Sequence, residues 1–281
     1  MKKAFVNLIH TLLNIVLPRQ CAGCGLESED FCKNCSLASY QKGAQCLICG
    51  LRNKDGKTCH KHRILNQILW AGRYDNALRK AIWQLKYKKR KELAAPLAKM
   101  MWKKFSEIHG NSFLASHFSR HEYPAAAGFL CSSRSVGTAQ GLEKRMPLKN
   151  FSQQNASSFA IIPIPLHFKK QYERGFNQAE LLSKEFSRLS NIPLLANTLL
   201  KIKETPAQVE TPNKELRIKN LEKAFQINPK ISKSDLMLLT SGALILIDDV
   251  ATTGSTLFHA ASALRIAGAK KIIGLVVAHG A

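Results

Sequence analysis

The sequence predicts an α/β protein with a doubly wound, mainly parallel sheet and a small cysteine-rich module near its N-terminal end. Two observations lead to this prediction. Short apolar runs that are typical of buried strands alternate with segments of helical periodicity from residue 159 onward. Seven of the eight cysteines, in contrast, fall between residues 21 and 59. A chain of 281 residues has room for one α/β domain and a small additional module.

The most specific pattern lies at residues 244–256. The apolar residues 244–247 predict a fully buried strand, and the neighbouring carboxylates of Asp248 and Asp249 follow where we expect the strand to end. A hydroxyl-rich loop comes next, and residues 257–267 have the pattern of a helix. Loop amides and a helix N-terminus attract an anion such as phosphate, and hydroxyl groups add donors around its oxygens. The loop residues are Thr252, Thr253, Gly254, Ser255 and Thr256.

Two carboxylates beside a bound phosphate would suit the hydroxyl groups of a ribose, either directly or through Mg²⁺. The alternative is an ordinary strand–turn–helix unit with an acidic pair at its surface. A second strand is predicted at residues 159–165, and the cations that follow it, Arg174 among them, suit a second anion at the carboxyl end of that strand. A helix at residues 179–189 and a buried strand at residues 271–277 continue the alternation.

Two long segments lack a sustained period. Residues 107–158 are rich in Ser, Ala, Gly and Asn, and we expect them to form a disordered, mobile insert. Residues 201–225 are polar and contain two prolines, Pro206 and Pro212, so we expect a mobile lid there.

The cysteine-rich segment has the form of a tandem repeat. Cys21 and Cys24 recur 25 positions later as Cys46 and Cys49, and a glycine follows the second cysteine of each pair. Cys32 recurs as Cys59, and the same offset places His62 where the first repeat has Cys35; His60 is the alternative. Cysteine pairs at this spacing are typical of zinc sites. We therefore expect two structural zinc ions, with ligands Cys21, Cys24, Cys32 and Cys35 in the first site and Cys46, Cys49, Cys59 and His62 in the second.

A crossed partition of the ligands between the repeats stays open. Closed four-ligand sites leave no position for a reactant, so the module is either structural or a binding platform. These boundaries divide the chain into an amphipathic helix at residues 1–20, a double zinc-binding module at 21–65 and an α/β domain at 66–281.

The N-terminal residues 1–17 begin with two lysines and continue with an apolar stretch. The stretch is too short and too polar to span a bilayer, and no small-residue cleavage site follows it. Its apolar residues follow helical spacing, so we expect an amphipathic helix that packs on the protein. We expect a cytoplasmic protein, in which cysteines stay reduced and are available as metal ligands.

The chain is strongly basic, because 42 Lys and Arg against 19 Asp and Glu give a net charge of +23. This excess favours a polyanionic partner, nucleic acid before a membrane surface, although a basic surface without a partner is the alternative. Residues 77–85 predict an apolar helix face. Basic and aromatic side chains gather on the opposite face, as single-stranded nucleic acid requires: Arg79, Trp83, Lys86, Tyr87 and Arg90. In the alternative interpretation, Trp83 packs against the zinc module and the lysines are solvated.

These motifs together resemble the competence protein F family (ComF, also GntX-like), whose members join an N-terminal zinc module to a type I phosphoribosyltransferase domain. Residues 248–250 with 252–256 resemble the signature for phosphoribosyl pyrophosphate (PRPP), and residues 163–166 with 174–178 resemble a second family motif. The run at 174–178 is what separates this family from other phosphoribosyltransferases. Further similar positions are Leu85, Lys86, Tyr87, Thr205, Gln208, Arg217, Asn220, Ala224 and Phe225. The sequence departs from the family at His62, where a cysteine is expected, and at Lys203, where arginine is common.

The resemblance implies binding of PRPP with Mg²⁺ and handling of internalised single-stranded DNA in DNA uptake and natural transformation, with other competence proteins as further partners. In a phosphoribosyltransferase, Asp248 and Asp249 would hold the ribose, residues 252–256 the 5′-phosphate, and Arg174 the pyrophosphate. The fold alone does not imply turnover. A non-catalytic, PRPP-sensing DNA-handling module and a metabolic salvage phosphoribosyltransferase are therefore the alternatives.

Overall fold

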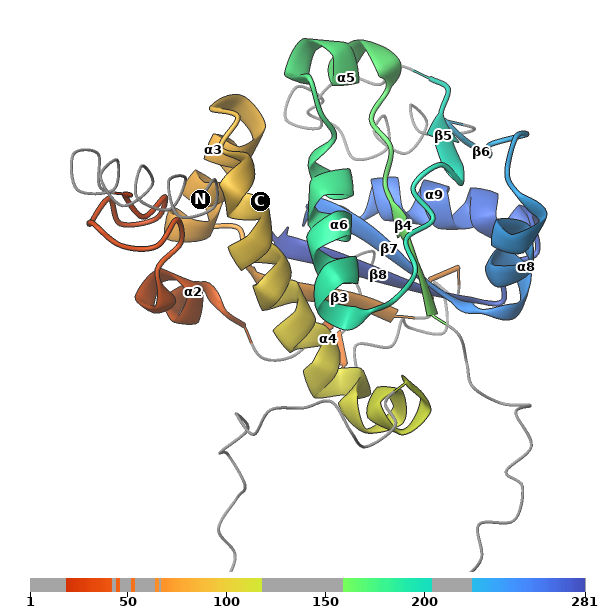
Figure 1. Cartoon of the computed structure of the whole chain (residues 1–281), viewed down its shortest axis with the longest axis horizontal. Helices are drawn as coiled ribbons and strands as arrows, with labels where there is room; N and C mark the ends of the chain where they lie inside the picture. The colour runs from red at the N-terminus through yellow and green to blue at the C-terminus, as the bar shows by residue number, and fades with distance from the viewer. Residues whose placement is uncertain are drawn as a thin grey trace, which may run out of the picture.

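The computed structural model describes residues 19–41, 44–45, 52–53, 64–65, 67–117, 159–203 and 224–280 (Figure 1). The described helices are α2 (Lys33–Ser39), α3 (Asn76–Tyr87), the 3-10 helix η1 (Lys91–Leu93), α4 (Ala94–His117), α5 (Phe168–Arg174), α6 (Gln178–Ser190), α8 (Lys233–Ser241) and α9 (Ser255–Ile266). The described strands are β1 (Ala44–Gln45), β2 (Arg52–Asn53), β3 (Gln67–Arg73), β4 (Phe159–Pro163), β5 (Leu199–Lys201), β6 (Phe225–Ile227), β7 (Ala243–Ala251) and β8 (Lys271–His279).

The main sheet has four parallel strands in the order β3-β8-β7-β4. In its register, Ile245 of β7 lies between Ile161 of β4 and Ile273 of β8. Residues 243–247 are buried on both faces of the sheet, as expected for a parallel sheet that helices cover on both sides. Two short antiparallel pairs, β1–β2 and β5–β6, complete the described strands.

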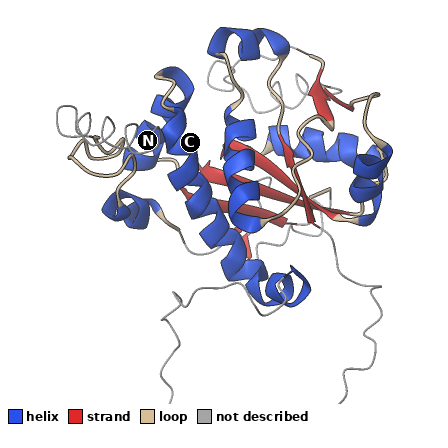
Figure 2. Cartoon of the chain, in the orientation of Figure 1, coloured by secondary structure: helices blue, strands red, loops and turns tan. Residues whose placement is uncertain are grey.

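A hydrophobic core lies on each face of this sheet. On one face, Ile245 and Ile247 belong to a cluster that includes Phe105 of α4 and Phe186 of α6. On the other face, the neighbouring Leu244 and Leu246 belong to a cluster with α9 and α8. Figure 2 shows this layering, with helices on both sides of the strands. The predicted fold class, an α/β protein with a doubly wound parallel sheet, is confirmed.

Several predicted boundaries were wrong. α4 continues as one helix to His117, past residue 107, where we placed the start of the insert. β7 continues to Ala251, so the two carboxylates lie within the strand and not after it. α9 begins at Ser255, which makes the last two loop residues the first turn of the helix. In the part of the chain that the structure describes, no helix is long and apolar enough to cross a membrane.

Three predicted segments fall largely or wholly outside the described residues. They are the amphipathic helix before residue 19, the insert after residue 117, and residues 204–223 of the lid. Of the predicted lid, residues 201–203 and 224–225 are described, and they include part of the β5–β6 pair.

Candidate functional site

The acidic pair sits near the carboxyl end of β7. Asp248 is partly buried and Asp249 is buried. The backbone N–H of Asp249 donates a hydrogen bond of 2.8 Å to Oδ1 of Asp248, which holds the first carboxylate against the strand. In a parallel sheet the carboxyl ends of the strands are where ligands bind, because the loops that follow converge there.

Lys86 of α3 reaches this pair from a distant part of the sequence. Its Nζ lies 2.9 Å from Oδ2 of Asp249, and both side chains are largely shielded from solvent. Burial alone would lower the pKa of Lys86, but attraction to Asp249 and the hydrogen bond between them raise it. Lys86 is therefore a charged ammonium at the candidate site, and it is a residue whose position the sequence did not reveal.

Burial, together with repulsion from Asp249, raises the pKa of Asp248 to about 7, while the charge of Lys86 opposes this shift. The folded protein consequently binds a proton at Asp248 more tightly than the unfolded chain, in which an aspartate titrates near pH 4. A raised pKa of an acid means that the folded state is favoured at low pH. Its contribution is present below about pH 4 and is lost as the pH rises toward 7.

We therefore expect Asp248→Asn to remove part of the pH dependence of stability. The free energy of unfolding of the wild type should fall between pH 4 and pH 7, and that of the variant, which mimics the neutral acid, should fall less, so that the variant is the more stable protein at pH 8. Urea unfolding at several pH values measures this difference. Glu173→Gln, at an exposed position on α5, is the control and should keep the wild-type slope. An Asp248→Asn protein with the wild-type slope would contradict the assignment.

The loop after β7 forms a small hollow beside the acidic pair, lined by Asp248, Thr252, Gly254 and Thr256, among others. Gly254 precedes α9 with φ of 73°, a conformation that favours glycine, and no side chain caps the helix there. The hydroxyl groups of Thr253 and Ser255 lie 2.7 Å apart. A helix N-terminus with neighbouring hydroxyl groups is chemically able to bind an anion.

Residues 174–178 make a tight connection between α5 and α6. Gly175 ends α5 with φ of 77°, and the side chain of Asn177 caps α6 by accepting a hydrogen bond of 3.0 Å from the N–H of Ala179. Arg174 donates to Oε1 of Gln178 at 3.2 Å. Residues 174–178 therefore form the turn between α5 and α6 and hold the side chain of Arg174 in place.

Two buried polar atoms lie close in sequence to this turn. Nδ1 of His167 and Nε2 of Gln178 have no hydrogen-bond partner among the described residues. Leaving such atoms unpaired costs free energy, and a bound polar ligand is one way to satisfy them. The guanidinium of Arg174 also lies 5.4 Å from the ring of Tyr87 on α3, so α3 and α5 meet beside the acidic pair.

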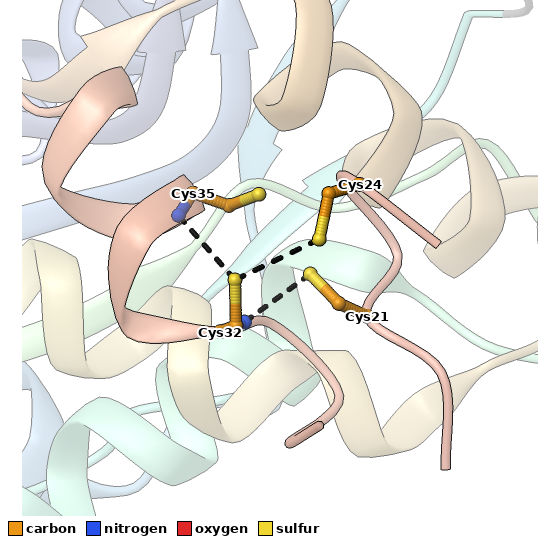
Figure 3. Close-up of side chains that lie close together, drawn as sticks. All are labelled: Cys21, Cys24, Cys32 and Cys35. Atoms are coloured by element: carbon orange, nitrogen blue, oxygen red, sulfur yellow. Dashed lines mark hydrogen bonds between the residues drawn. The ribbon is translucent and has the colours of Figure 1, made fainter. Parts of the chain in front are cut away.

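Figure 3 shows the four cysteines of the first predicted zinc site turned toward one another. The sulfur atoms of Cys21, Cys24, Cys32 and Cys35 all lie within 4.8 Å of one another, and those of Cys24 and Cys32 are 3.9 Å apart. Tetrahedral zinc with Zn–S bonds of about 2.3 Å requires sulfur atoms about 3.8 Å apart. The cluster is thus able to hold a metal such as zinc. The second predicted site, Cys46, Cys49, Cys59 and His62, lies outside the described residues.

Backbone amides favour the thiolate form of Cys21, which is the form that binds metal. Burial alone would raise the pKa of Cys21, but N–H groups that include those of Cys32, at 3.3 Å, and Gly23, at 3.4 Å, lower it to about 6. Cys32 caps α2 and accepts from the N–H of Cys35 at 3.5 Å. Burial and the other three thiols raise the pKa of Cys35. The thiolate is the form of cysteine that binds metal. A divalent cation would offset the negative charge of neighbouring thiolates in this cluster.

The cysteine cluster is attached directly to α3. A side-chain carbon at Gly23 would come within 2.8 Å of Cβ of Ala77, so only glycine allows this contact. Gln84 donates to the carbonyl of Ala22 at 3.0 Å, and Arg90 pairs with Asp30 at 3.0 Å. α3 thus connects the cysteine cluster, through Gln84, with the acidic pair, through Lys86.

The predicted basic and aromatic face of α3 was only partly right. Arg79 is exposed, and the side chains of Trp83 and Tyr87 are 46% and 56% exposed, with ring centres 5.8 Å apart. Lys86 and Arg90, however, form the ion pairs with Asp249 and Asp30 described above. The expectation that these two cations share the exposed face was wrong, because each forms an ion pair with a largely shielded carboxylate in another part of the chain.

The four-stranded parallel sheet, the covering helices and the N-terminal cysteine cluster define an α/β protein with the architecture of a phosphoribosyltransferase-like fold. No model of a known protein family matches the chain.

Curated relatives give a more particular assignment. The chain is 41% identical to competence protein F of Haemophilus influenzae over 113 residues, which are 40% of this chain and 47% of that protein. It is 34% identical to competence protein ComFC of Bacillus subtilis over 106 residues, 38% of each chain. It is 24% identical to DNA utilization protein YhgH of Salmonella typhi over 246 residues, 86% of each chain. The chain is a homologue of these proteins, and its match to competence protein F spans about half of that relative's length.

Proposed function

We propose that this protein binds Mg²⁺–PRPP at the end of β7 and single-stranded DNA on its basic surface, and that it acts in DNA uptake and natural transformation. One observation carries the PRPP part. Asp248 and Asp249 lie beside a hydroxyl-rich loop that leads into the N-terminus of α9, where the N-cap residue is Gly254. The DNA part is supported by the net charge of +23 and by homologues named for competence and DNA utilization.

Each part of the site has a task in this proposal. Asp248 and Asp249 hold the ribose hydroxyl groups, and residues 252–256 hold the 5′-phosphate. Arg174 and the residues after Pro165 hold the pyrophosphate group, for which Mg²⁺ supplies charge neutralisation when bound. Lys86 fixes the direction of the Asp249 side chain, since its Nζ lies 2.9 Å from Oδ2 of that residue.

The reaction that suits this arrangement is displacement of pyrophosphate from the anomeric carbon of PRPP. The carboxylates would offset the positive charge that develops on the sugar, and the cations would stabilise the leaving group. Pyrophosphate release, measured with and without single-stranded DNA, tests whether turnover occurs. Pyrophosphate release that depends on DNA supports the interpretation that the protein is an enzyme. Binding of PRPP without release supports the non-catalytic, PRPP-sensing module, and PRPP turnover without any DNA binding supports a metabolic salvage enzyme.

Single-stranded DNA should bind with a strong dependence on salt, because each neutralised phosphate releases counterions. Arg79→Gln combined with Lys88→Gln should flatten the slope of log K against log [salt] by roughly 0.7 for each phosphate contact that is lost. Both residues are exposed on or beside α3, and Lys88 lies 5.6 Å from the ring of Trp83. Fluorescence anisotropy of a labelled oligonucleotide at several salt concentrations measures the slope.

Lys230→Gln combined with Lys233→Gln is the matched control, because it removes the same charge from exposed positions near α8. It should leave the slope close to that of the wild type. Equal slopes for the two double variants would place the DNA path away from α3.

A further inference from the structure

A groove of about 470 Å³ lies between α5 and the segment that includes β5, apart from the phosphate hollow after β7. Figure 1 shows α5 above the end of β4 and β5 beside it. Leu166, Phe168 and Gln171 line one side, and Asn197, Lys201 and Ile202 line the other. The volume is that of a small-molecule binding pocket.

The walls of this groove combine apolar and amide groups with one carboxylate, that of Glu180, which is paired with Lys184 at 2.7 Å. Phe168 is 70% exposed although it is large and apolar, and Ile202 is 49% exposed. Exposure of such apolar surfaces to water is unfavourable, and the two side chains together provide two apolar contacts for a planar ligand. Gln171 and Asn197 add amide groups, which both donate and accept hydrogen bonds. A planar ring with polar edges, such as a nucleobase, could contact the two apolar side chains with its face and form hydrogen bonds to the two amides with its edge.

Cations lie at the same place. Lys201 lines the groove, and Lys170, on α5, lies close enough for its positive charge to act on Lys201. Burial lowers the pKa of Lys201, repulsion from Lys170 adds to this, and attraction to Asp248 opposes it. Two neighbouring cations favour an anion. The groove lies beside the strand that carries the acidic pair, because Pro163, which lines the groove, pairs with Ile247, the residue before Asp248.

We propose that this groove holds one nucleotide of single-stranded DNA, with the base against Phe168 and Ile202 and the backbone phosphate beside Lys201 and Lys170. This inference rests on the proposed function and extends it, because it brings the DNA next to the PRPP site. A bound base would explain why Phe168 and Ile202 are exposed, and a bound phosphate would explain why the two lysines lie close together. Pyrophosphate alone would use the cations and leave the exposed surfaces of Phe168 and Ile202 in water.

The test is a titration of the full chain with a single-stranded oligonucleotide that contains 2-aminopurine, whose fluorescence is quenched when it stacks. Phe168→Ala should reduce the affinity roughly 5- to 150-fold, the equivalent of one lost base–aromatic stack, and should reduce the quenching. Lys201→Gln should lower the log–log salt slope by roughly 0.7, as one lost phosphate contact requires. Tyr172→Ala removes a 90% exposed aromatic from the same helix, outside the groove, and should bind like the wild type.

The outcomes separate the two claims. A wild-type chain that binds no single-stranded DNA overturns the DNA part of the proposed function and the groove with it. A wild type that binds DNA, with Phe168→Ala and Lys201→Gln unchanged, overturns the groove alone. If Lys201→Gln weakens binding of inorganic pyrophosphate and leaves DNA binding unchanged, the groove is a pyrophosphate site and not a nucleotide site.

Discussion

Asp249→Asn is expected to abolish measurable binding of Mg²⁺–PRPP and to lower the free energy of unfolding by about 3–5 kcal/mol. The loss of binding follows from the proposed contact with the ribose. The loss of stability has a separate cause: Lys86, 2.9 Å away and largely buried, would lose the carboxylate with which it forms its ion pair. Breaking a buried ion pair from one side costs much more than replacing the pair as a whole. Urea unfolding at pH 7 measures the stability.

The double variant Lys86→Met with Asp249→Asn separates these two effects. Methionine fills the space of the lysine stem without a charge, so the double variant should recover most of the stability that the single variant loses. It should not recover PRPP binding. Two single variants whose stability losses simply add in the double variant would show that the pair contributes no coupling energy.

The second large effect concerns the cysteine cluster. Cys35→Ser is expected to reduce the bound zinc by one ion per chain and to unfold the segment around residues 21–39. Structural zinc contributes about 10–16 kcal/mol to the folding of isolated zinc-finger peptides, which is as much as the stability of a whole domain. Cys21 and Cys35 are buried within the same core as α3 and α4, so the damage should extend to the helix that carries Lys86.

Elemental analysis and hydrogen exchange measure this prediction. Protection of the amides in α2 and α3 should fall in Cys35→Ser. Cys131→Ser makes the same chemical change outside the cysteine-rich segment, and it should keep the wild-type zinc content. A Cys35→Ser protein with unchanged zinc would show that these four cysteines do not bind the metal.

The features that could be predicted from sequence are those whose residues are neighbours in the chain. The strand–loop–helix order around Asp248, the spacing of Cys21, Cys24, Cys32 and Cys35, and the buried face of α3 all depend on local periodicity. The structure confirms the helix face, with Leu78 and Ile82 buried, and brings the four cysteines together.

The features that could not be predicted depend on partners distant in sequence. Periodicity placed Lys86 and Arg90 on the polar side of α3, but it could not show which carboxylates lie opposite. Polar residues at the end of a helix are usually solvated, and only the packing of α3 against the sheet brings Lys86 to Asp249. The edge strand β3 and the helix α8 were also missed, because a short mixed segment gives a weak periodic signal.

The most direct test of the central claim is calorimetric titration of Mg²⁺–PRPP into the wild type and into the folded Lys86→Met, Asp249→Asn double variant. The account predicts that the wild type binds one PRPP per chain, that ribose 5-phosphate competes for the site, and that the double variant gives no heat of binding. A double variant that is folded and binds PRPP with wild-type affinity would contradict the account, because the acidic pair at the end of β7 would then not be the PRPP site.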